Sequence, residues 1–553
     1  MNDIRRTILW VIFGFSMVML WDQWQIHNGR QATFFPSPRP AATAQAPATP
    51  AVPAPSASVL PAGTAAAAAT PGAVPGTSAA PAAARERVTI ATDVMRVTFD
   101  TQGGSVVRTE FLKHAAKSVT EKSNDNFVLL ESGPDHIYVA DTGLVGGDFP
   151  NHKTVMTFSG DRSLKDGADQ LVARFESPVQ GGVKLVKTYT LRRGAYEVAV
   201  THEVQNVGGA PVSPQLYLQL VRGGSSSGGN FLTNPTGTFT GPAVYTEEKK
   251  FQKIEFTDIE KSKADFQKDS TNGYIAMVQH YFASAWILPA GAKRENFVRK
   301  VDANLYAVGT LAPIAAVAPG TSQKVESRLF MGPQEEKMLE RVTPGLDLVK
   351  DYGIFTIIAK PLYWLLDKIH TVLGNWGWSI MALVLVIKIA FYWLQAKGYE
   401  SMAKMKAINP RVMAMRERYK DNPQQMQQEM MRIYREEKVN PLGGCLPILV
   451  QMPFFIALYW VLLSSVEMRN APWIGWIRDL ASPDPYFILP LVMTLTTLLQ
   501  TALNPVPPDP MQARLMWFMP LIFSVMFFFF PAGLVLYWIT NNVLSIAQQW
   551  LIN

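Results

Sequence analysis

Cysteine is nearly absent from this 553-residue chain, which contains only Cys445. One cysteine cannot form an intrachain disulfide, and it cannot build a cysteine-based zinc site within one chain. No Gly-Lys dipeptide occurs anywhere, so the chain lacks a Walker phosphate-binding loop. We therefore expect no disulfide framework, no metal site, no cofactor and no nucleotide hydrolysis.

Signals of catalysis are scarce as well. Residues 224–228 have the spacing of a nucleophile elbow, but they lie in a glycine- and serine-rich loop, not at a strand-to-helix turn. His202 and Glu203 lack the second histidine of a zinc-protease helix, since position 206 is asparagine. A net charge of +7 without a basic stripe does not indicate nucleic-acid binding. The sequence predicts no enzyme, no catalytic residues and no recognition of a specific nucleic-acid sequence.

The amino-terminal residues resemble a membrane-targeting element. Two arginines precede a mainly apolar run over residues 8–20, and two tryptophans follow it as interfacial anchors. The next residues are bulky and polar, which favours an uncleaved signal-anchor span (1–24) over a removed signal peptide. The arginine pair favours a cytoplasmic amino terminus.

Two extramembrane segments come next. Residues 25–84 are rich in Ala, Pro, Thr, Ser and Gly, and such a composition is typical of a flexible linker. Residues 85–340 contain short runs that alternate apolar and polar side chains, as in 94–100, 185–191 and 196–204. This period of two, with frequent turns, predicts an antiparallel β-sandwich, which we expect on the outer side of the membrane.

The carboxy-terminal part is apolar. Residues 341–375 include a stretch too polar to span a bilayer, which predicts a linker and an interfacial amphipathic helix. Within 376–553, apolar runs predict five spans, so that the chain has six spans with the anchor; their ranges are 376–397, 442–465, 486–503, 514–530 and 533–551.

The charge distribution indicates how these spans are oriented. Residues 397–438 contain ten Lys or Arg residues, whereas the loop between the spans 442–465 and 486–503 contains two. Basic loops mark the cytoplasmic side of a membrane, so both termini and the segment 398–438 are expected there.

Segment 398–438 has the pattern of a helical hairpin. Methionines and other apolar residues recur every three to four positions, and Asn422-Pro423 fits a helix cap followed by proline at the first helical position. The methionines fit either the core of the hairpin or an adaptable binding surface. The candidate contact residues of the hairpin are Met402, Met405, Arg416, Arg418, Met426 and Met430.

Lys388 is the most informative residue, because it lies roughly 18 Å along the apolar run that begins at Trp376, at 1.5 Å per helical residue. An ammonium at that depth costs about 2.5–3.5 kcal/mol on insertion-based scales. Its side chain would either extend to the nearer interface or enter a polar cavity. Candidate polar residues lining such a cavity are Gln500, Tyr537, Thr540 and Asn541, although each would also suit an interhelical hydrogen bond.

With these elements placed, the whole chain resembles the YidC-type membrane protein insertases of Gram-negative bacteria. The resemblance rests on segments that include T-Q-G-G-S-V-V (101–107), G-N-W-G-W-S-I (374–380), K-V-N-P-L-G-G-C (438–445), Q-M-P-F-F-I-A-L-Y (451–459), D-P-M-Q (509–512) and F-P-A-G-L-V-L-Y-W (530–538).

The resemblance implies a periplasmic β-supersandwich and a five-span core around a hydrophilic groove. The family's central groove cation is usually arginine, and Lys388 occupies the matching position. A lysine keeps the charge but loses bidentate recognition of carboxylates. Further groove residues of the family map onto Gln500 and Trp538.

The implied function is the insertion and folding of nascent inner-membrane proteins, alone or with the Sec translocon. The implied partners are nascent chains, the ribosome, the Sec translocon with its accessory subunits, and the lipid bilayer. A secondary transporter is the alternative, although the sequence shows no internal repeat. A carbohydrate-processing ectodomain is a third hypothesis, without a catalytic constellation to support it.

Overall fold

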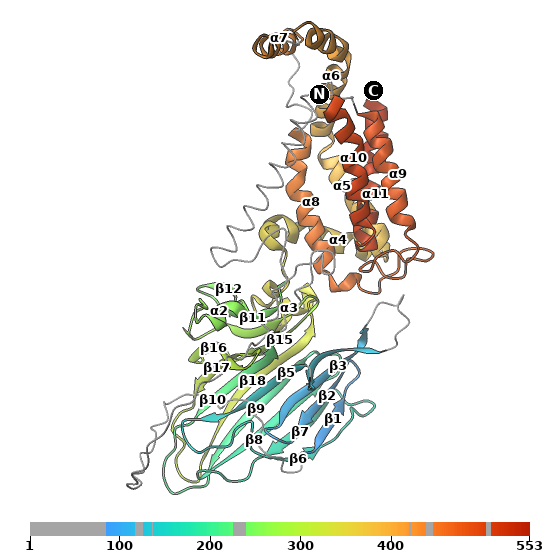
Figure 1. Ribbon diagram of the computed structural model, residues 1–553. Coiled ribbons are helices and arrows are strands. Elements are labelled where there is room, and N and C mark those ends of the chain that lie inside the picture. The colour runs from blue at the N-terminus through green and yellow to red at the C-terminus, as the bar shows by residue number, and fades with distance from the viewer. Residues whose placement is uncertain are drawn as a thin grey trace, which may run out of the picture. The chain divides into compact units, whose positions relative to one another are not determined.

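A computed structural model of the chain describes residues 85–116, 125–134, 136–224, 239–419, 422–437, 446–504 and 510–552. The predicted anchor at 1–24, the predicted linker at 25–84 and Cys445 lie outside these residues. The described part begins with two β-sheets and continues into a series of helices (Figure 1).

The first sheet has nine antiparallel strands in the order β1-β2-β3-β4-β5-β10-β17-β16-β13. Their bounds are Arg87–Ala91 (β1), Met95–Asp100 (β2), Ser105–Ala115 (β3), Asn126–Ser132 (β4), Ile137–Val145 (β5), Gln215–Gly223 (β10), Leu305–Pro313 (β17), Arg294–Asp302 (β16) and Asp269–Ser270 (β13).

The second sheet also has nine antiparallel strands, in the order β12-β11-β14-β15-β18-β9-β8-β7-β6. Their bounds are Lys250–Lys253 (β12), Gly241–Thr246 (β11), Tyr274–Val278 (β14), Phe282–Ile287 (β15), Ser322–Pro333 (β18), Glu197–Asn206 (β9), Val183–Arg192 (β8), Gln170–Glu176 (β7) and Thr157–Gly160 (β6).

The core lies between these two sheets. Strand β9 buries every second residue, including Val198, Val200 and Val204, so one of its faces packs against the opposite sheet. The Trp286 indole on β15 donates to the carbonyl of Gln219 on β10, a hydrogen bond of 3.1 Å from one sheet to the other. The predicted antiparallel β-sandwich is thus confirmed, including the three alternating runs, which form β2, β8 and β9.

The sandwich buries two basic side chains near each other. Lys187 donates to the carbonyls of Gly103 (2.6 Å) and Thr142 (2.7 Å), and burial lowers its pKa to about 7. The His202 imidazole pairs with the Thr142 hydroxyl at 3.0 Å. Burial and the nearby charge of Lys187 lower the pKa of His202 to about 3. Both polar groups are therefore accommodated by hydrogen bonds inside an apolar core.

One short helix, α2, lies between strands of the sandwich in the sequence, and the other helices follow its last strand. They are α2 (Phe256–Glu260), α3 (Glu336–Val342), α4 (Thr356–Leu373), α5 (Trp376–Ala390), α6 (Tyr392–Arg418), α7 (Pro423–Glu436), α8 (Leu446–Ser464), α9 (Ile488–Leu503), α10 (Pro510–Phe527) and α11 (Ala532–Ile552), with short 3₁₀ turns η2 (Leu346–Val349), η3 (Gly353–Phe355) and η4 (Val466–Met468).

A buried ion pair joins the segment before α4 to the turn after α8. The Lys350 ammonium lies 3.3 Å from the Glu467 carboxylate and 4.1 Å from the centre of the Tyr363 ring. The Tyr363 hydroxyl donates to Glu467 at 2.6 Å. These contacts hold α4 against η4. Separating the two elements would be costly, because it would leave a buried charge unpaired.

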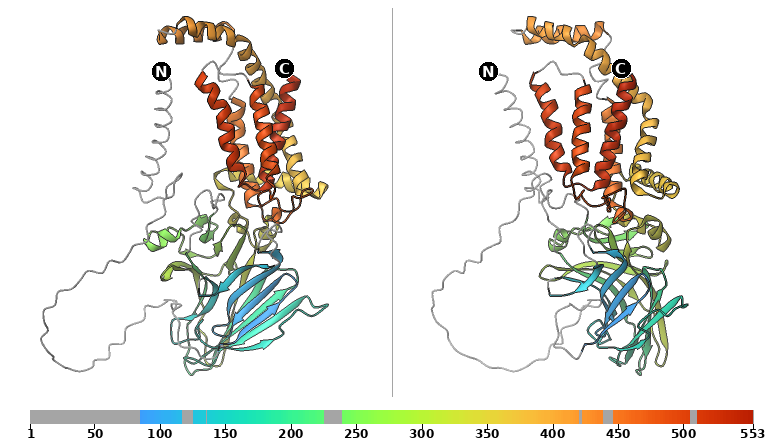
Figure 2. Two further views of the ribbon diagram at one scale, coloured as in Figure 1. Left: turned by 45° about the vertical axis from the view of Figure 1, so that its right-hand side comes forward. Right: turned by 90° about the vertical axis from the view of Figure 1, so that its right-hand side faces the viewer.

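The predicted span 376–397 is not one continuous helix. Helix α5 ends at Ala390, and α6 begins at Tyr392 after a bend of 69°. The last residues of the predicted span therefore belong to the first helix of the hairpin (Figure 2). In the hairpin, Asn422 caps α7 by accepting from the backbone N–H of Gln425 (3.3 Å), with Pro423 at the start of the helix as expected.

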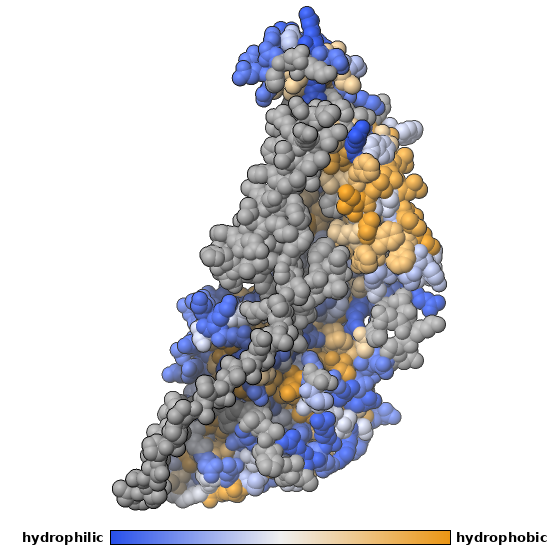
Figure 3. All heavy atoms as spheres, in the orientation of Figure 1, coloured by the Kyte–Doolittle hydropathy of each residue, from blue (hydrophilic) through white to orange (hydrophobic). Residues whose placement is uncertain are grey.

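By length and composition, no individual helix in the described ranges would cross a membrane; α5 and α6 meet that criterion only as a bent pair. Three further apolar helical segments are shorter, at Val450–Ser464, Ile488–Leu503 and Ala513–Phe527. Hydrophobic side chains gather over the helical part of the surface, whereas hydrophilic ones dominate the hairpin (Figure 3). The count of six spans stays a prediction.

The pKa of His202 makes the stability of the sandwich dependent on pH. An unfolded histidine titrates near pH 6.5, so unfolding takes up a proton between about pH 6.5 and 3. This stabilisation is complete above about pH 6.5 and is lost as pH falls toward 3. We expect protection of the β9 amides against hydrogen exchange, corrected for intrinsic rates, to decrease by about 1.4 kcal/mol per pH unit per proton.

The matched variant is His202→Gln, which lacks the titrating group. Its protection should depend less on pH by about one proton. The remaining dependence comes from groups that include His114 and His280, whose pKa values burial also lowers to about 4, and His136 and His152, whose pKa values burial lowers too. The assignment is wrong if wild type and variant show the same pH dependence.

Candidate functional site

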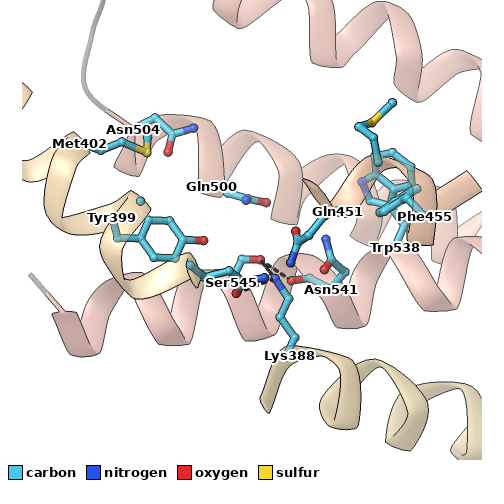
Figure 4. A pocket seen from close by; sticks show the side chains of 13 residues that line it. Lys388, Tyr399, Met402, Gln451, Phe455, Gln500, Asn504, Trp538, Asn541 and Ser545 are labelled. Atoms are coloured by element: carbon cyan, nitrogen blue, oxygen red, sulfur yellow. Dashed lines mark hydrogen bonds between the residues drawn. The ribbon is translucent and has the colours of Figure 1, made fainter. Parts of the chain in front are cut away.

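A cavity of about 260 Å³ lies among helices α5, α6, α8, α9 and α11. Its walls combine one cation, several primary amides, thioethers and aromatic rings (Figure 4). The lining residues are Lys388, Gln395, Gly398, Tyr399, Met402, Gln451, Met452, Phe455, Gln500, Asn504, Trp538, Asn541 and Ser545.

Lys388 lies in the last turn of α5, three residues before the break at Phe391. The free carbonyls at a helix carboxyl end carry partial negative charge, which stabilises a cation there by about 0.3–1 kcal/mol. A continuous helix would have left this ammonium at mid-helix without that field. The bend between α5 and α6 is thus one reason why the chain tolerates a buried lysine.

Two hydrogen bonds hold the ammonium inside the cavity. Its Nζ donates to the Ser545 hydroxyl on α11 at 2.6 Å and lies 3.5 Å from the Gln395 amide oxygen on α6. The Ser545 hydroxyl in turn donates to the carbonyl of Asn541 at 2.7 Å. Lys388 is buried, so its side chain does not extend to an interface in this structure.

The ammonium retains capacity for a ligand. It has three N–H groups, and two have partners among the described residues. The described side chains that line the cavity include no aspartate or glutamate. An incoming carboxylate would therefore meet an unneutralised positive charge.

The predicted groove residues fall into three groups. Gln500, Trp538 and Asn541 line the same cavity as Lys388. Tyr537 lines a smaller neighbouring cavity of about 20 Å³, to which Lys388 and Asn541 also contribute. Thr540 lines neither of these cavities, because it is buried and its hydroxyl donates to the carbonyl of Leu536 at 2.8 Å within α11.

Sequence reasoning missed Gln395, Gln451, Asn504 and Ser545. Two of them had a usable signal: Ser545 follows Asn541 by four residues and so shares its helix face, and Gln451 is the one amide in the apolar run of α8. Gln395 had none, because its approach to Lys388 depends on the break between α5 and α6.

Aromatic rings form the apolar side of the cavity. The rings of Phe455 on α8 and Trp538 on α11 meet edge to face with centroids 4.6 Å apart. Phe527 on α10 also packs edge to face against Trp538, with ring centroids 4.8 Å apart. Edge-to-face packing of this kind limits the freedom of the rings, so this wall is well defined.

Polar contacts fix α11 to α9 beside the cavity. The Asn542 amide donates to the hydroxyls of Thr497 (2.9 Å) and Thr496 (3.3 Å). The Gln549 amide donates to the carbonyl of Leu503 at 3.1 Å. These amides serve helix packing, unlike those that line the cavity.

The candidate hairpin residues have different surroundings. Met405, Met426 and Met430 pack against the hairpin's own core, which consists of Ile408, Val412, Met415 and Ile433. Met402 lines the cavity instead. Arg416 is half-buried and Arg418 is exposed. Three of the methionines thus contribute to the core of the hairpin.

Over the described ranges, no three His, Cys, Asp or Glu side chains are placed to hold a metal ion.

Comparison with known proteins assigns both parts of the chain. Residues 87–365 match the model of the YidC periplasmic domain, and residues 368–553 match that of the 60Kd inner membrane protein. A Ralstonia nicotianae protein named membrane protein insertase YidC is 55% identical over 557 residues, which cover all of this chain and 98% of the relative. The chain belongs to the YidC family.

A second relative agrees with this membership. The Cupriavidus necator protein of the same name is 55% identical over 556 residues, covering all of this chain and 97% of that protein. A crystal structure described as an active YidC insertase with its first transmembrane domain resolved aligns over 84% of this chain and 92% of its own, with 17% identity and a TM-score of 0.39.

Access to the cavity is testable by cysteine labelling. In a Cys445→Ala background, Asn541→Cys should react in membrane vesicles with a small water-soluble maleimide, because position 541 lines the cavity. Thr540→Cys, its neighbour on the same helix, should react at least about tenfold more slowly because it is buried. Equal labelling of the two positions would contradict the assignment of the cavity.

Proposed function

We propose that the chain inserts nascent membrane proteins into the inner membrane by receiving a short polar segment of each in the cavity around Lys388. The observation that carries this mechanism is a buried ammonium in a polar cavity whose described walls offer no carboxylate. Membership of the YidC family, with relatives named membrane protein insertases, supports the activity itself.

The proposed topology follows the sequence. Residues 1–24 and five helices of 376–553 span the membrane, the domain at 85–340 is periplasmic, and both termini are cytoplasmic. Helix α4 lies along the periplasmic interface within the linker segment 341–375. Its exposed side includes Ile357, Trp364 and Val372, and such an apolar stripe suits contact with lipid.

In the first step, the ribosome presents a nascent chain near the hairpin at 398–438. The hairpin exposes Lys406, Arg418 and Arg435, which suit electrostatic contact with a polyanionic surface. The Sec translocon and its accessory subunits are proposed partners for larger substrates. No nucleotide is required by this step.

In the second step, the polar segment enters the cavity and its carboxylate approaches Lys388. One ion pair at about 4 Å and an effective dielectric constant of about 20 supplies on the order of 4 kcal/mol before desolvation. This offsets part of the free energy required to bring a polar segment partway across the membrane. The substrate's apolar helix then moves into lipid. This transfer is favourable by about 25 cal/mol for each Å² of apolar surface removed from water.

A transporter mechanism fits less well. Transporters built on inverted repeats use paired broken helices around a midplane site. Among the described helices, α5 and α6 form one bent pair, whereas this transporter mechanism would require two broken helices related by an inverted repeat.

The charge at position 388 is testable in reconstituted vesicles. Lys388→Ala and Lys388→Glu should slow insertion of a substrate with an acidic tail by about tenfold or more, equivalent to about 1.4 kcal/mol. Lys388→Arg should insert the same substrate at a rate near that of wild type, since it retains the charge.

A substrate of equal length with a neutral tail provides the control. Its insertion should change much less in the Ala variant. Unchanged insertion of the acidic tail by Lys388→Glu would contradict the proposed role of the ammonium.

A further inference from the structure

Five primary amides line the cavity, and four of them lie in four different helices. Gln395 belongs to α6, Gln451 to α8, Gln500 to α9 and Asn541 to α11, and Asn504 directly follows the end of α9. Figure 4 shows Gln451, Gln500 and Asn541 converging on the space in front of the Lys388 ammonium. Amides therefore surround this space from several sides.

Most of these amides are not used to hold the protein together. The side-chain amides of Gln451, Gln500, Asn504 and Asn541 have no hydrogen-bond partner among the described residues, and all four are partly exposed. Asn542, by contrast, bonds to hydroxyls of α9. An amide carries two N–H donors and a carbonyl acceptor, so the cavity offers unfilled hydrogen-bonding capacity of both kinds.

The main chain of a polypeptide needs this kind of capacity. Every residue of an unfolded segment carries an N–H and a C=O, and these groups require partners wherever water is scarce. A side-chain amide is the same chemical group as a peptide bond, and it pairs with either. Because every residue except proline presents the same N–H and C=O, such pairing carries no sequence preference.

We infer that Gln451, Gln500 and Asn541 bind the main chain of an extended substrate segment, independently of its side-chain charge. This inference rests on the proposed function, and it assigns two kinds of substrate recognition to the cavity. Lys388 recognises acidic side chains, whereas the amides recognise the peptide groups that every substrate shares. The cavity then accepts neutral as well as acidic tails.

The central test removes the amides while keeping side-chain size. The triple variant Q451M/Q500M/N541L should slow insertion of acidic and neutral Gly/Ser tails by the same factor, with about fivefold expected for each lost hydrogen bond. Lys388→Ala should slow the acidic tail selectively. The matched control is Gln323→Met, which removes an exposed amide from β18, outside both the cavity and the hairpin, and should leave insertion unchanged.

Two further arms separate main-chain binding from a folding defect. Adding Met452→Gln to the triple variant returns an amide to the cavity wall and should restore part of the insertion rate. A neutral tail rich in proline, which lacks N–H donors, should be inserted more slowly by wild type and should lose less in the triple variant. Thermal melts in detergent should match wild type in every variant.

The outcomes distinguish the two proposals. If Lys388→Ala is selective for acidic tails while the triple variant inserts all tails at the wild-type rate, main-chain recognition is overturned and the proposed function stands. A triple variant that melts like wild type but is not improved by Met452→Gln also overturns it. If the wild-type protein inserts none of these tails, the proposed function itself fails.

Discussion

The contact between the Lys388 ammonium and the Ser545 hydroxyl is the interaction on which the rest of the helical part depends. At 2.6 Å it joins the end of α5 to α11, and the Gln395 amide oxygen adds a weaker contact from α6. A buried ammonium is tolerated only where hydrogen bonds replace its lost water. Neutral partners do this without cancelling the charge, so the positive potential stays available to a substrate.

The surrounding helices are built to keep this arrangement open. Asn542 and Gln549 hold α11 against α9, and the rings of Phe455 and Trp538 define the opposite wall. Helix–helix hydrogen bonds of this kind compensate for the weak hydrophobic drive between helices in lipid. These contacts hold the walls of the proposed site for extended, unfolded segments in place.

Much of the architecture was predictable because periodicity reports burial directly. Alternation in strand β9 predicted the sandwich, and the proline at position 423 after a capping asparagine predicted the start of α7. The bend at Phe391 was not predicted, since no proline or glycine marks it and the apolar run continues through it. Without the bend, the approach of Gln395 to Lys388 and the position of Lys388 in a last helical turn were beyond sequence reasoning.

In the candidate site, too, some residues were predictable from the sequence and others were not. Gln500, Trp538 and Asn541 are polar or family-matched positions in apolar runs, and they line the cavity. Thr540 met the same criterion of a polar residue in an apolar run, yet its hydroxyl bonds within its own helix. One residue along a helix rotates a side chain by about 100°, so composition alone does not decide which neighbour faces a cavity.

The most direct test of the central claim is photo-crosslinking from defined positions to a ribosome-bound nascent membrane protein. A crosslinking amino acid at Gln500, in the cavity, should capture the polar tail of the substrate, whereas the same group at Leu495, exposed on the same helix, should not capture that tail. Capture of the tail from position 495 but not from position 500 would show that substrates bypass the cavity and would contradict the account.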